Sequence, residues 1–308
     1  MYKLPFYIHQ DCILHKTPTL HPESINRSVA LLDAISKVDY LDIISNINLV
    51  NKSILTLVHP QYYLDSLQVD TPSYLDSDTI VTKESFYVSH LAVSALCHAL
   101  DNITANNKYK FVAFRPPGHH AETDKAMGFC LLNSIAIAAK HAQQIGYKKV
   151  CIIDFDVHHG NGTQHIFETD PTILYISSHQ YPFYPGTGSI DEIGYDKGKH
   201  FTVNWPLPAG TSDENLLELY SSKLPELLSS FKPDIILVSA GYDIHKNDPL
   251  GQFNISTNAI GELIYILLKS STPTPMIFSL EGGYNLNALC ESVLETCSQI
   301  ISFVTTSK

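Results

Sequence analysis

Short runs of apolar, β-branched residues recur along the chain, and each ends in a polar, glycine-rich stretch. Runs of this length and composition are typical of buried strands. Segments of helical character separate them, so strands and helices alternate. The pattern predicts strands at 111–114, 150–155, 173–176, 235–240 and 276–280, and helices at 132–145, 214–229 and 257–269.

This alternation predicts an α/β fold of three layers, in which helices flank both faces of a mostly parallel central sheet. Right-handed crossovers bring the ends of parallel strands to one edge of the sheet, so the polar loops after the strands should meet there. Near the N-terminus we expect an edge strand at 5–9, a lid-like loop and a helix at 23–36. No linker interrupts the pattern, so one domain over residues 1–308 is expected.

Charge and composition narrow the class of partner. The formal net charge is −11, and the arginines are Arg27 and Arg115 alone. Because phosphate contacts need a basic patch, direct nucleic-acid binding is not expected. An acidic surface either aids solubility or suits a cationic partner such as a Lys-rich peptide or a polyamine. No apolar run is long enough to span a membrane, and the N-terminus lacks a signal-peptide pattern. We therefore expect a cytoplasmic protein, with secretion into a host left open.

The segment 154–162, DFDVHHGNG, follows a buried apolar run and is the most informative part of the chain. Side chains two apart on a strand point the same way, so Asp156 and His158 should project together. A carboxylate beside an imidazole suits a divalent transition metal, zinc above all. Asp243, which follows another expected strand, is the candidate third ligand, and a turn or cap role is its alternative. Three such ligands would leave a position open for water and substrate.

Two adjacent histidines, His119 and His120, follow the expected strand at 111–114. Neighbouring imidazoles at a loop point in different directions, so they suit proton transfer better than joint binding of one metal. A carboxylate or amide behind each ring would fix its tautomer, and Asp154 and Asn161 are the candidates. An ordinary surface loop is the alternative interpretation.

Three aromatic residues are expected near the same edge of the sheet. Tyr284 follows a strand and two glycines, and a tyrosine hydroxyl placed there can stabilise an oxyanion. Phe129 and Tyr184 could line a narrow slot for an extended alkyl chain. Core packing is the alternative for each of the three.

Taken together, these motifs resemble the zinc-dependent histone deacetylase superfamily. The motifs that carry the resemblance are RPPGHHAE, GFCLLN, DFDVHHGNGTQ, PGTG, SAGYD and EGGYN, in that order. With the weaker matches HPE near His21 and DSDT around Asp78, the resemblance covers nearly the whole chain, from about His21 to Tyr284. The superfamily includes acetylpolyamine amidohydrolases and bacterial deacetylase-like amidohydrolases, and its fold is related to that of arginase. The resemblance implies a single deacetylase catalytic domain.

The resemblance also implies a role for each catalytic residue. Zinc and His120 would activate a water that attacks the acetamide carbonyl, while His119 acts as an electrostatic partner. Tyr284 would donate to the tetrahedral oxyanion, and His120 would then protonate the leaving amine. The implied zinc ligands are Asp156, His158 and Asp243, and Asp154 would hold His119.

Further positions are implied for substrate and for a second ion. The expected substrate contacts are Gly128, Phe129, Tyr184, the pocket-wall residue Leu250 and the rim residue Asp78. A potassium ion close to the zinc would involve Asp154, Asp156, His158 and Ser177. Potassium is therefore expected as a structural ion beside the catalytic metal.

Several positions indicate which subfamily of this superfamily the chain resembles. Asn161 replaces the aspartate of class I enzymes and is similar to class II-like members, and Tyr284 is the residue of the active form. Gly160 stands where arginases need a second aspartate, so a binuclear site is not expected. Leu250 stands where polyamine-selective relatives carry glutamate, which favours acyl-lysine as the substrate.

The sequence thus predicts a metal-dependent hydrolase that removes acetyl or related acyl groups from lysine N-ε amines in peptides or proteins. The alternatives are an acetylpolyamine or other small-amide hydrolase and a catalytically silent acyl-lysine binding module. Iron(II) is an alternative to zinc, since the ligand set accepts either metal. Acyl-chain length, physiological substrate and oligomeric state stay open. The many Asn, Ile and Lys residues indicate a bacterial source.

Overall fold

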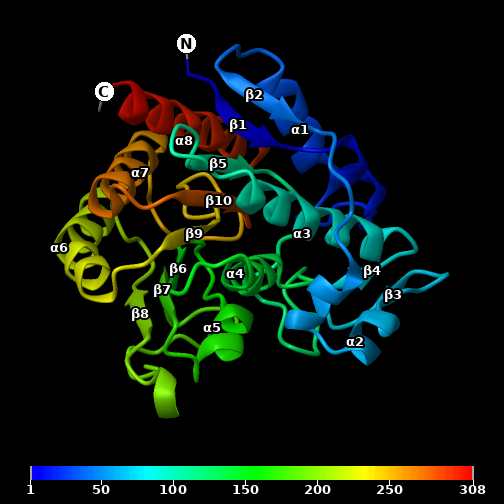
Figure 1. The fold of residues 1–308 in the computed structure, drawn as a ribbon. Helices are drawn as coiled ribbons and strands as arrows, with labels where there is room; N and C mark the ends of the chain where they lie inside the picture. Colours follow the sequence, from blue (N-terminus) through cyan, green and yellow to red (C-terminus); the bar gives the residue numbers. More distant parts are fainter. Residues whose placement is uncertain (1, 307–308) are drawn as a thin grey trace.

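An eight-stranded, wholly parallel sheet forms the centre of the computed structural model, which describes residues 2–306 (Figure 1). The strand order is β2-β1-β5-β10-β9-β6-β7-β8. The five inner strands from β5 to β7 are buried at every position, as expected for a parallel sheet covered on both faces. The strands of this sheet are β1 (Leu4–Tyr7), β2 (Leu41–Ile44), β5 (Tyr109–Val112), β6 (Val150–Asp154), β7 (Ile173–Gln180), β8 (Thr202–Leu207), β9 (Ile235–Ala240) and β10 (Met276–Leu280).

Helices cover both faces of the sheet, and this confirms the predicted three-layer α/β fold (Figure 1). One face carries α1 (Ile25–Ile35), α6 (Asp213–Phe231), α7 (Thr257–Ser271) and α8 (Leu286–Thr306). The other carries α2 (Gln61–Ser66), α3 (Ser85–Asp101), α4 (Ser134–Gln144) and α5 (Asn161–Phe167). The smaller elements are the hairpin of β3 (Ser73–Tyr74) and β4 (Ile80–Val81) and the 3-10 turns Gln10–Leu14, Lys52–Leu57 and Asp196–Gly198.

The alternation of side chains along a strand explains why the chain forms two cores. In β6, Cys151 and Ile153 pack in the cluster beneath α6, α7 and α8. Val150 and Ile152 point the other way and pack beneath α3 and α4. Since successive side chains on a strand face opposite sides, an unbroken apolar run serves both layers at once.

The prediction of an edge strand at 5–9 was wrong. β1 begins at Leu4 and lies between β2 and β5, so β2 forms that edge of the sheet. The sequence pattern missed β2 because the strand is short and Asp42 interrupts its apolar residues. It also missed β8 at the opposite edge, where half-buried residues alternate with buried Thr202 and Asn204.

The loops that follow β5, β6, β9 and β10 meet at the carboxyl edge of the sheet, where open α/β sheets bind their ligands.

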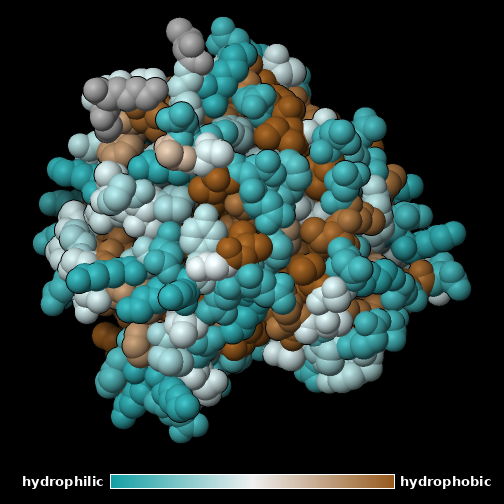
Figure 2. All heavy atoms as spheres, viewed as in Figure 1, coloured by the Kyte–Doolittle hydropathy of each residue, from teal (hydrophilic) through white to brown (hydrophobic). Residues whose placement is uncertain are grey.

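Figure 2 shows hydrophilic residues along the outline of the molecule and apolar residues gathered nearer the centre of the view. Within residues 2–306, no helix has the length and apolar character that crossing a membrane requires.

Candidate active site

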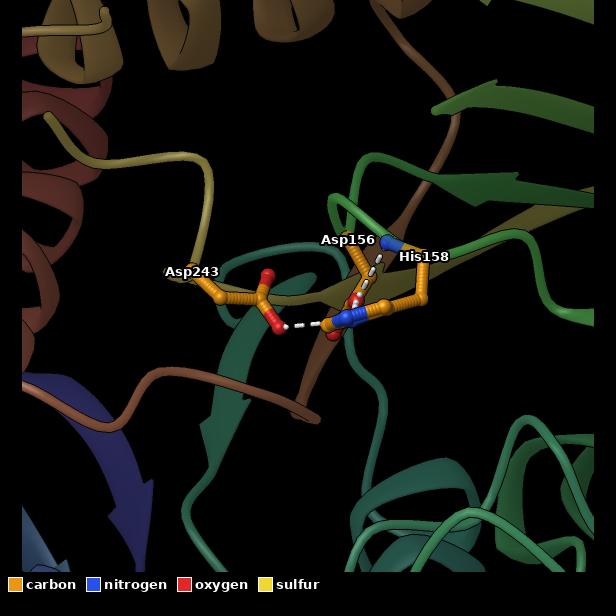
Figure 3. Close-up of side chains that lie close together, drawn as sticks. All are labelled: Asp156, His158 and Asp243. Atoms are coloured by element: carbon orange, nitrogen blue, oxygen red, sulfur yellow. Dashed lines mark hydrogen bonds and ion pairs between the residues drawn. The ribbon is translucent and has the colours of Figure 1, made fainter. Parts of the chain in front are cut away.

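Two carboxylates and one imidazole converge at the carboxyl ends of β6 and β9. The Nδ1 atom of His158 lies 3.1 Å from Asp156 Oδ1 and 3.2 Å from Asp243 Oδ2 (Figure 3). One ligand atom from each residue lies within 4.8 Å of the others. Because β6 and β9 are paired neighbours, the loops that follow them bring the three residues together, as the sequence predicted.

The charges of this cluster suit a divalent cation. Burial and the negative charge of Asp156 raise the pKa of Asp243 to about 7. Burial opposes a proton on His158, yet hydrogen bonds with Asp156 and Asp243 raise its pKa to about 10. Two buried carboxylates thus compete for one proton-bearing ring, and a bound cation would relieve this competition by neutralising both. The donor set, two oxygens and one nitrogen, therefore fits a catalytic zinc site.

Two glycines let the backbone approach these carboxylates closely. A Cβ atom on Gly282 would lie 2.1 Å from Asp243 Oδ2, and one on Gly241 would lie 2.0 Å from Asp156 Oδ2. Because Gly282 has no side chain, its backbone amide comes close enough to donate a hydrogen bond to Asp156 Oδ2, at 2.8 Å. A larger residue at either position would push a carboxylate out of the cluster.

His119 and His120 lie side by side, with ring centroids 4.1 Å apart, but they face different partners. His119 Nδ1 lies 3.0 Å from Asp154 Oδ2, and His120 Nδ1 lies 2.8 Å from Asn161 Oδ1. The structure thus places Asp154 and Asn161 behind the two rings, where the sequence predicted them. His120, unlike His119, lines the cavity.

The two histidines also differ in charge. Burial opposes protonation of His119, but the carboxylates of Asp154 and Asp156 raise its pKa to about 10. Burial, followed by the charges of His119 and His158, lowers the pKa of His120 well below its ordinary value. The surroundings thus favour a proton on His119, whereas they favour a neutral His120 that can accept one.

A cavity of about 400 Å³ leads to this cluster. Its walls are mainly aromatic: the rings of Phe129 and Tyr284 lie 5.8 Å apart, and Tyr184 lies 5.2 Å from His120. All five predicted substrate contacts line it, and so do three residues given no substrate role by the sequence, namely His21, Pro22 and Phe183. The predicted contacts are Asp78, Gly128, Phe129, Tyr184 and Leu250. This shape suits a long, apolar chain that carries a reactive group at its inner end.

Tyr284 lines the same cavity as the metal-ligand candidate His158. Burial and the nearby charge of Asp243 raise the pKa of its hydroxyl well above the ordinary value, so the group is a hydrogen-bond donor at neutral pH. The loop is held from both sides. Asp248 Oδ2 accepts from the backbone amides of Tyr284 at 2.6 Å and Asn285 at 3.1 Å. The Arg27 guanidinium lies 5.1 Å from the centre of the tyrosine ring.

Sequence reasoning missed a buried ion network beneath this loop. Arg27 Nε donates to the Gly283 carbonyl at 2.7 Å, and Arg115 Nε donates to Glu23 Oε1 at 2.7 Å. Burial opposes ionisation of Glu23, but Arg115 outweighs it and lowers the pKa of this carboxyl to about 2. The only hint in the sequence was that the chain contains just two arginines. Both of them are buried in this network.

Ser177 lies beside Asp154 on the neighbouring strand and is fully buried. Its hydroxyl is 2.9 Å from His179 Nδ1. The fold therefore brings Ser177 to the strand end that carries Asp154 and Asp156, and the potassium site expected there stays a prediction.

Comparison with known proteins supports the resemblance to histone deacetylases. A family model for the histone deacetylase domain matches residues 21–300. An uncharacterized protein of Synechocystis, slr0245, is 38% identical over 301 residues, which cover 94% of this chain and 97% of that protein. Histone deacetylase 10, chloroplastic, of Oryza sativa is 36% identical over 303 residues, or 90% of this chain and 68% of that one. A probable deacetylase of Methanothermobacter thermautotrophicus is 37% identical over 278 residues, or 88% and 83% of the two chains.

A solved structure shows the same fold. The HDA15 HD domain superposes with a TM-score of 0.92 at 33% sequence identity, over 98% of this chain and 88% of that one. The resemblance carried by the sequence motifs is thereby confirmed over nearly the whole length of the described structure. The chain belongs to the histone deacetylase family, and the activity that its membership supports is deacetylation.

Proposed function

We propose that the protein removes acetyl, or a related acyl group, from the N-ε amine of lysine in peptides or proteins. One observation carries the proposal. His120, His158 and Tyr284 line the same aromatic-walled cavity, so a base, a metal ligand and an oxyanion donor all face whatever enters it. An acyl-lysine side chain has the length and apolar stem to fill such a cavity and ends in the amide on which these groups would act.

Zinc is the proposed metal, with iron(II) as the alternative, and Asp156, His158 and Asp243 would hold it. When bound, such an ion polarises an amide carbonyl and lowers the pKa of a water. Potassium at Asp154, Asp156, His158 and Ser177 belongs to the same proposal.

The remaining steps fall to side chains of this chain. His120, neutral and bonded to Asn161 through Nδ1, would take a proton at Nε2 from the water that attacks the acyl carbonyl. Tyr284 would donate its hydroxyl proton as a hydrogen bond to the oxyanion. His120 would then give its proton to the nitrogen of the leaving amine as the C–N bond breaks. Acetate and a free amine result.

Leu250 bears on the class of substrate. It lines the cavity and presents no charge to a second amine. A polyamine carries such an amine and would lose hydration without gaining a carboxylate partner at this wall. This observation supports acyl-lysine over the alternative substrate, an acetylpolyamine.

A direct comparison tests the substrate assignment. The protein is incubated separately with an acetyl-lysine peptide and with acetylspermidine, and released acetate is measured. We expect a higher kcat/KM for the peptide. A higher kcat/KM for acetylspermidine would overturn the assignment to lysine.

A further inference from the structure

A chain of hydrogen bonds runs from His120 in the cavity through Asn161 to two residues nearer the surface that the proposed reaction does not use, Glu122 and His165. His120 Nδ1 lies 2.8 Å from Asn161 Oδ1, and Asn161 Nδ2 donates to Glu122 Oε1 at 2.5 Å. The same carboxylate oxygen lies 2.8 Å from His165 Nδ1. The His165 side chain is 39% exposed and that of Glu122 is 20% exposed, whereas Asn161 is buried.

The chemistry of these groups gives the chain a direction. A carboxylate only accepts hydrogen bonds, whereas an amide presents a donor on one side and an acceptor on the other. Glu122 therefore draws the NH2 group of Asn161 toward itself and leaves the amide oxygen facing His120. An oxygen acceptor requires a proton on His120 Nδ1. In a neutral ring, Nε2 is then bare.

The other contacts of the Asn161 amide agree with this orientation. Its Nδ2 atom lies 3.4 Å from the His120 carbonyl oxygen and 3.4 Å from Met127 Sδ. Both of these atoms are acceptors, but the contacts are long, and sulfur is a weak acceptor. Glu122 supplies the short, charge-assisted bond that sets the amide.

We propose that Glu122 is a positioning residue for His120. Through Asn161, it keeps the proton of the neutral imidazole on Nδ1, so that Nε2 faces the cavity ready to accept one. This inference rests on the proposed function of His120 as the base. It extends that function, because the activity of the base would then depend on Glu122, a carboxylate that contacts neither the substrate nor a metal ligand.

The segments that carry Glu122 and Asn161 are also held in place by contacts of neighbouring residues, independently of the Glu122–Asn161 bond. The Thr163 amide donates to the His119 carbonyl at 3.1 Å, and Asn133 Nδ2 donates to the Ala121 carbonyl at 3.1 Å. A Cβ atom on Gly162 would lie 2.2 Å from the Ala121 carbonyl oxygen, so only glycine allows this approach. A substitution at Glu122 should therefore change the direction of the hydrogen bonds that link Glu122, Asn161 and His120, while the backbone stays in place.

Glu122→Gln is the first variant to measure, since a glutamine side chain can turn either a donor or an acceptor toward Asn161. We expect kcat on acetyl-lysine peptide to fall on the order of 10-fold, the worth of one hydrogen bond to a charged group, with KM unchanged. Glu168→Gln is the matched control. Glu168 is half-buried and acts on His165 by charge, but the described structure gives its carboxylate no bond to Asn161. The control should keep the full kcat.

A rescue experiment separates polarity from packing. Asn161→Asp alone would set a second carboxylate against Glu122 and should lower kcat. Adding Glu122→Gln removes that repulsion and supplies an NH2 donor, so the new carboxylate at position 161 can again accept from His120. The double variant should be more active than either single variant. Because Asn161→Asp and Glu122→Gln barely change side-chain shape, such a rescue reports charge and hydrogen-bond direction rather than packing. A double variant no more active than the better single variant would overturn the proposal.

A readout without turnover keeps the inference distinct from the proposed function. Nitrogen-15 NMR of zinc-loaded protein reports which ring nitrogen of His120 carries the proton. We expect Nδ1 in the unchanged protein and a measurable Nε2 population in Glu122→Gln. A protein inactive on every acyl substrate would overturn the proposed function but leave this result standing, whereas an unchanged His120 tautomer in Glu122→Gln would overturn the role of Glu122.

Discussion

The two adjacent histidines of this site differ in their favoured charge because each has a different hydrogen-bond partner. His119 is backed by the carboxylate of Asp154, whereas His120 is backed by the amide of Asn161. The first partner favours a charged ring, and the second leaves the ring neutral. The tandem histidines and both partners could be predicted from the motif spacing. The charge of each ring could not, because it depends on burial and on Asp156 and His158 as further neighbours.

Replacing Tyr284 by phenylalanine tests the oxyanion role with little change in shape. We expect kcat to fall about 10²- to 10³-fold, the usual cost of one oxyanion donor, with zinc content and KM unchanged. Steady-state kinetics on acetyl-lysine peptide measure the effect. A variant with full kcat would show that the hydroxyl takes no part in the reaction.

Gly282→Ala tests how closely the backbone must approach the ligand cluster. The added Cβ would meet Asp243 Oδ2 and Asp156 Oδ2, so zinc affinity should weaken by at least about 10-fold. Gly146→Ala is the control. Gly146 has a positive φ, but nothing lies within 4 Å of its Cβ position, so its zinc content should not change. Metal analysis after dialysis against limiting zinc measures both, and equal retention by the two variants would contradict the account.

At the scale of the elements, the fold serves the site by gathering loops at one edge of the sheet. The strands that carry those loops were predictable because each contains or adjoins a short run of consecutive apolar residues. β2 and β8 were not, since edge strands are only partly buried and their patterns mix polar with apolar residues. The buried ions were not predictable either. Glu23 and Arg115 are 92 residues apart in the chain, and no local pattern links them.

Arg27 connects α1 to the loop that carries Tyr284, so its loss should reduce stability. Arg27→Met would abandon the bonds to Gly283 and Glu281 and leave Glu23 with one cation fewer. We expect the free energy of unfolding to fall on the order of 3 kcal/mol. Lys37→Met removes the same charge from the exposed Lys37–Asp33 pair next to that helix and should cost under about 1 kcal/mol. Denaturant unfolding compares the two, and similar losses would contradict the structural role of Arg27.

For the whole molecule, buried neutral histidines predict lability in acid. Burial lowers the pKa of His15, His59 and His179 to about 4 in each case. Unfolding restores an ordinary value near 6.5. Between these values the unfolded chain binds more protons than the folded one, so stability falls as pH falls below about 6.5. Each histidine contributes up to about 1.4 kcal/mol per pH unit in this window.

The measurement is denaturant unfolding of metal-depleted protein at pH 7.5 and at pH 5.0, which removes any contribution from zinc release. We expect a clearly lower free energy of unfolding at pH 5.0. His59→Gln should flatten the dependence, since glutamine offers a donor and an acceptor without titrating. A pH dependence in His59→Gln as steep as in the unchanged protein would contradict the role of His59 in this acid lability.

We propose that the cluster of Asp156, His158 and Asp243 makes this chain a metal-dependent deacylase of lysine. The most direct measurement is hydrolysis of a fluorogenic acetyl-lysine peptide by metal-depleted protein, before and after one equivalent of zinc, with a hydroxamate chelator as the control. The account predicts no turnover without metal, turnover restored by zinc, and its abolition by the hydroxamate. Turnover that is unaffected by metal removal, or zinc-loaded protein that leaves the peptide intact, would contradict it.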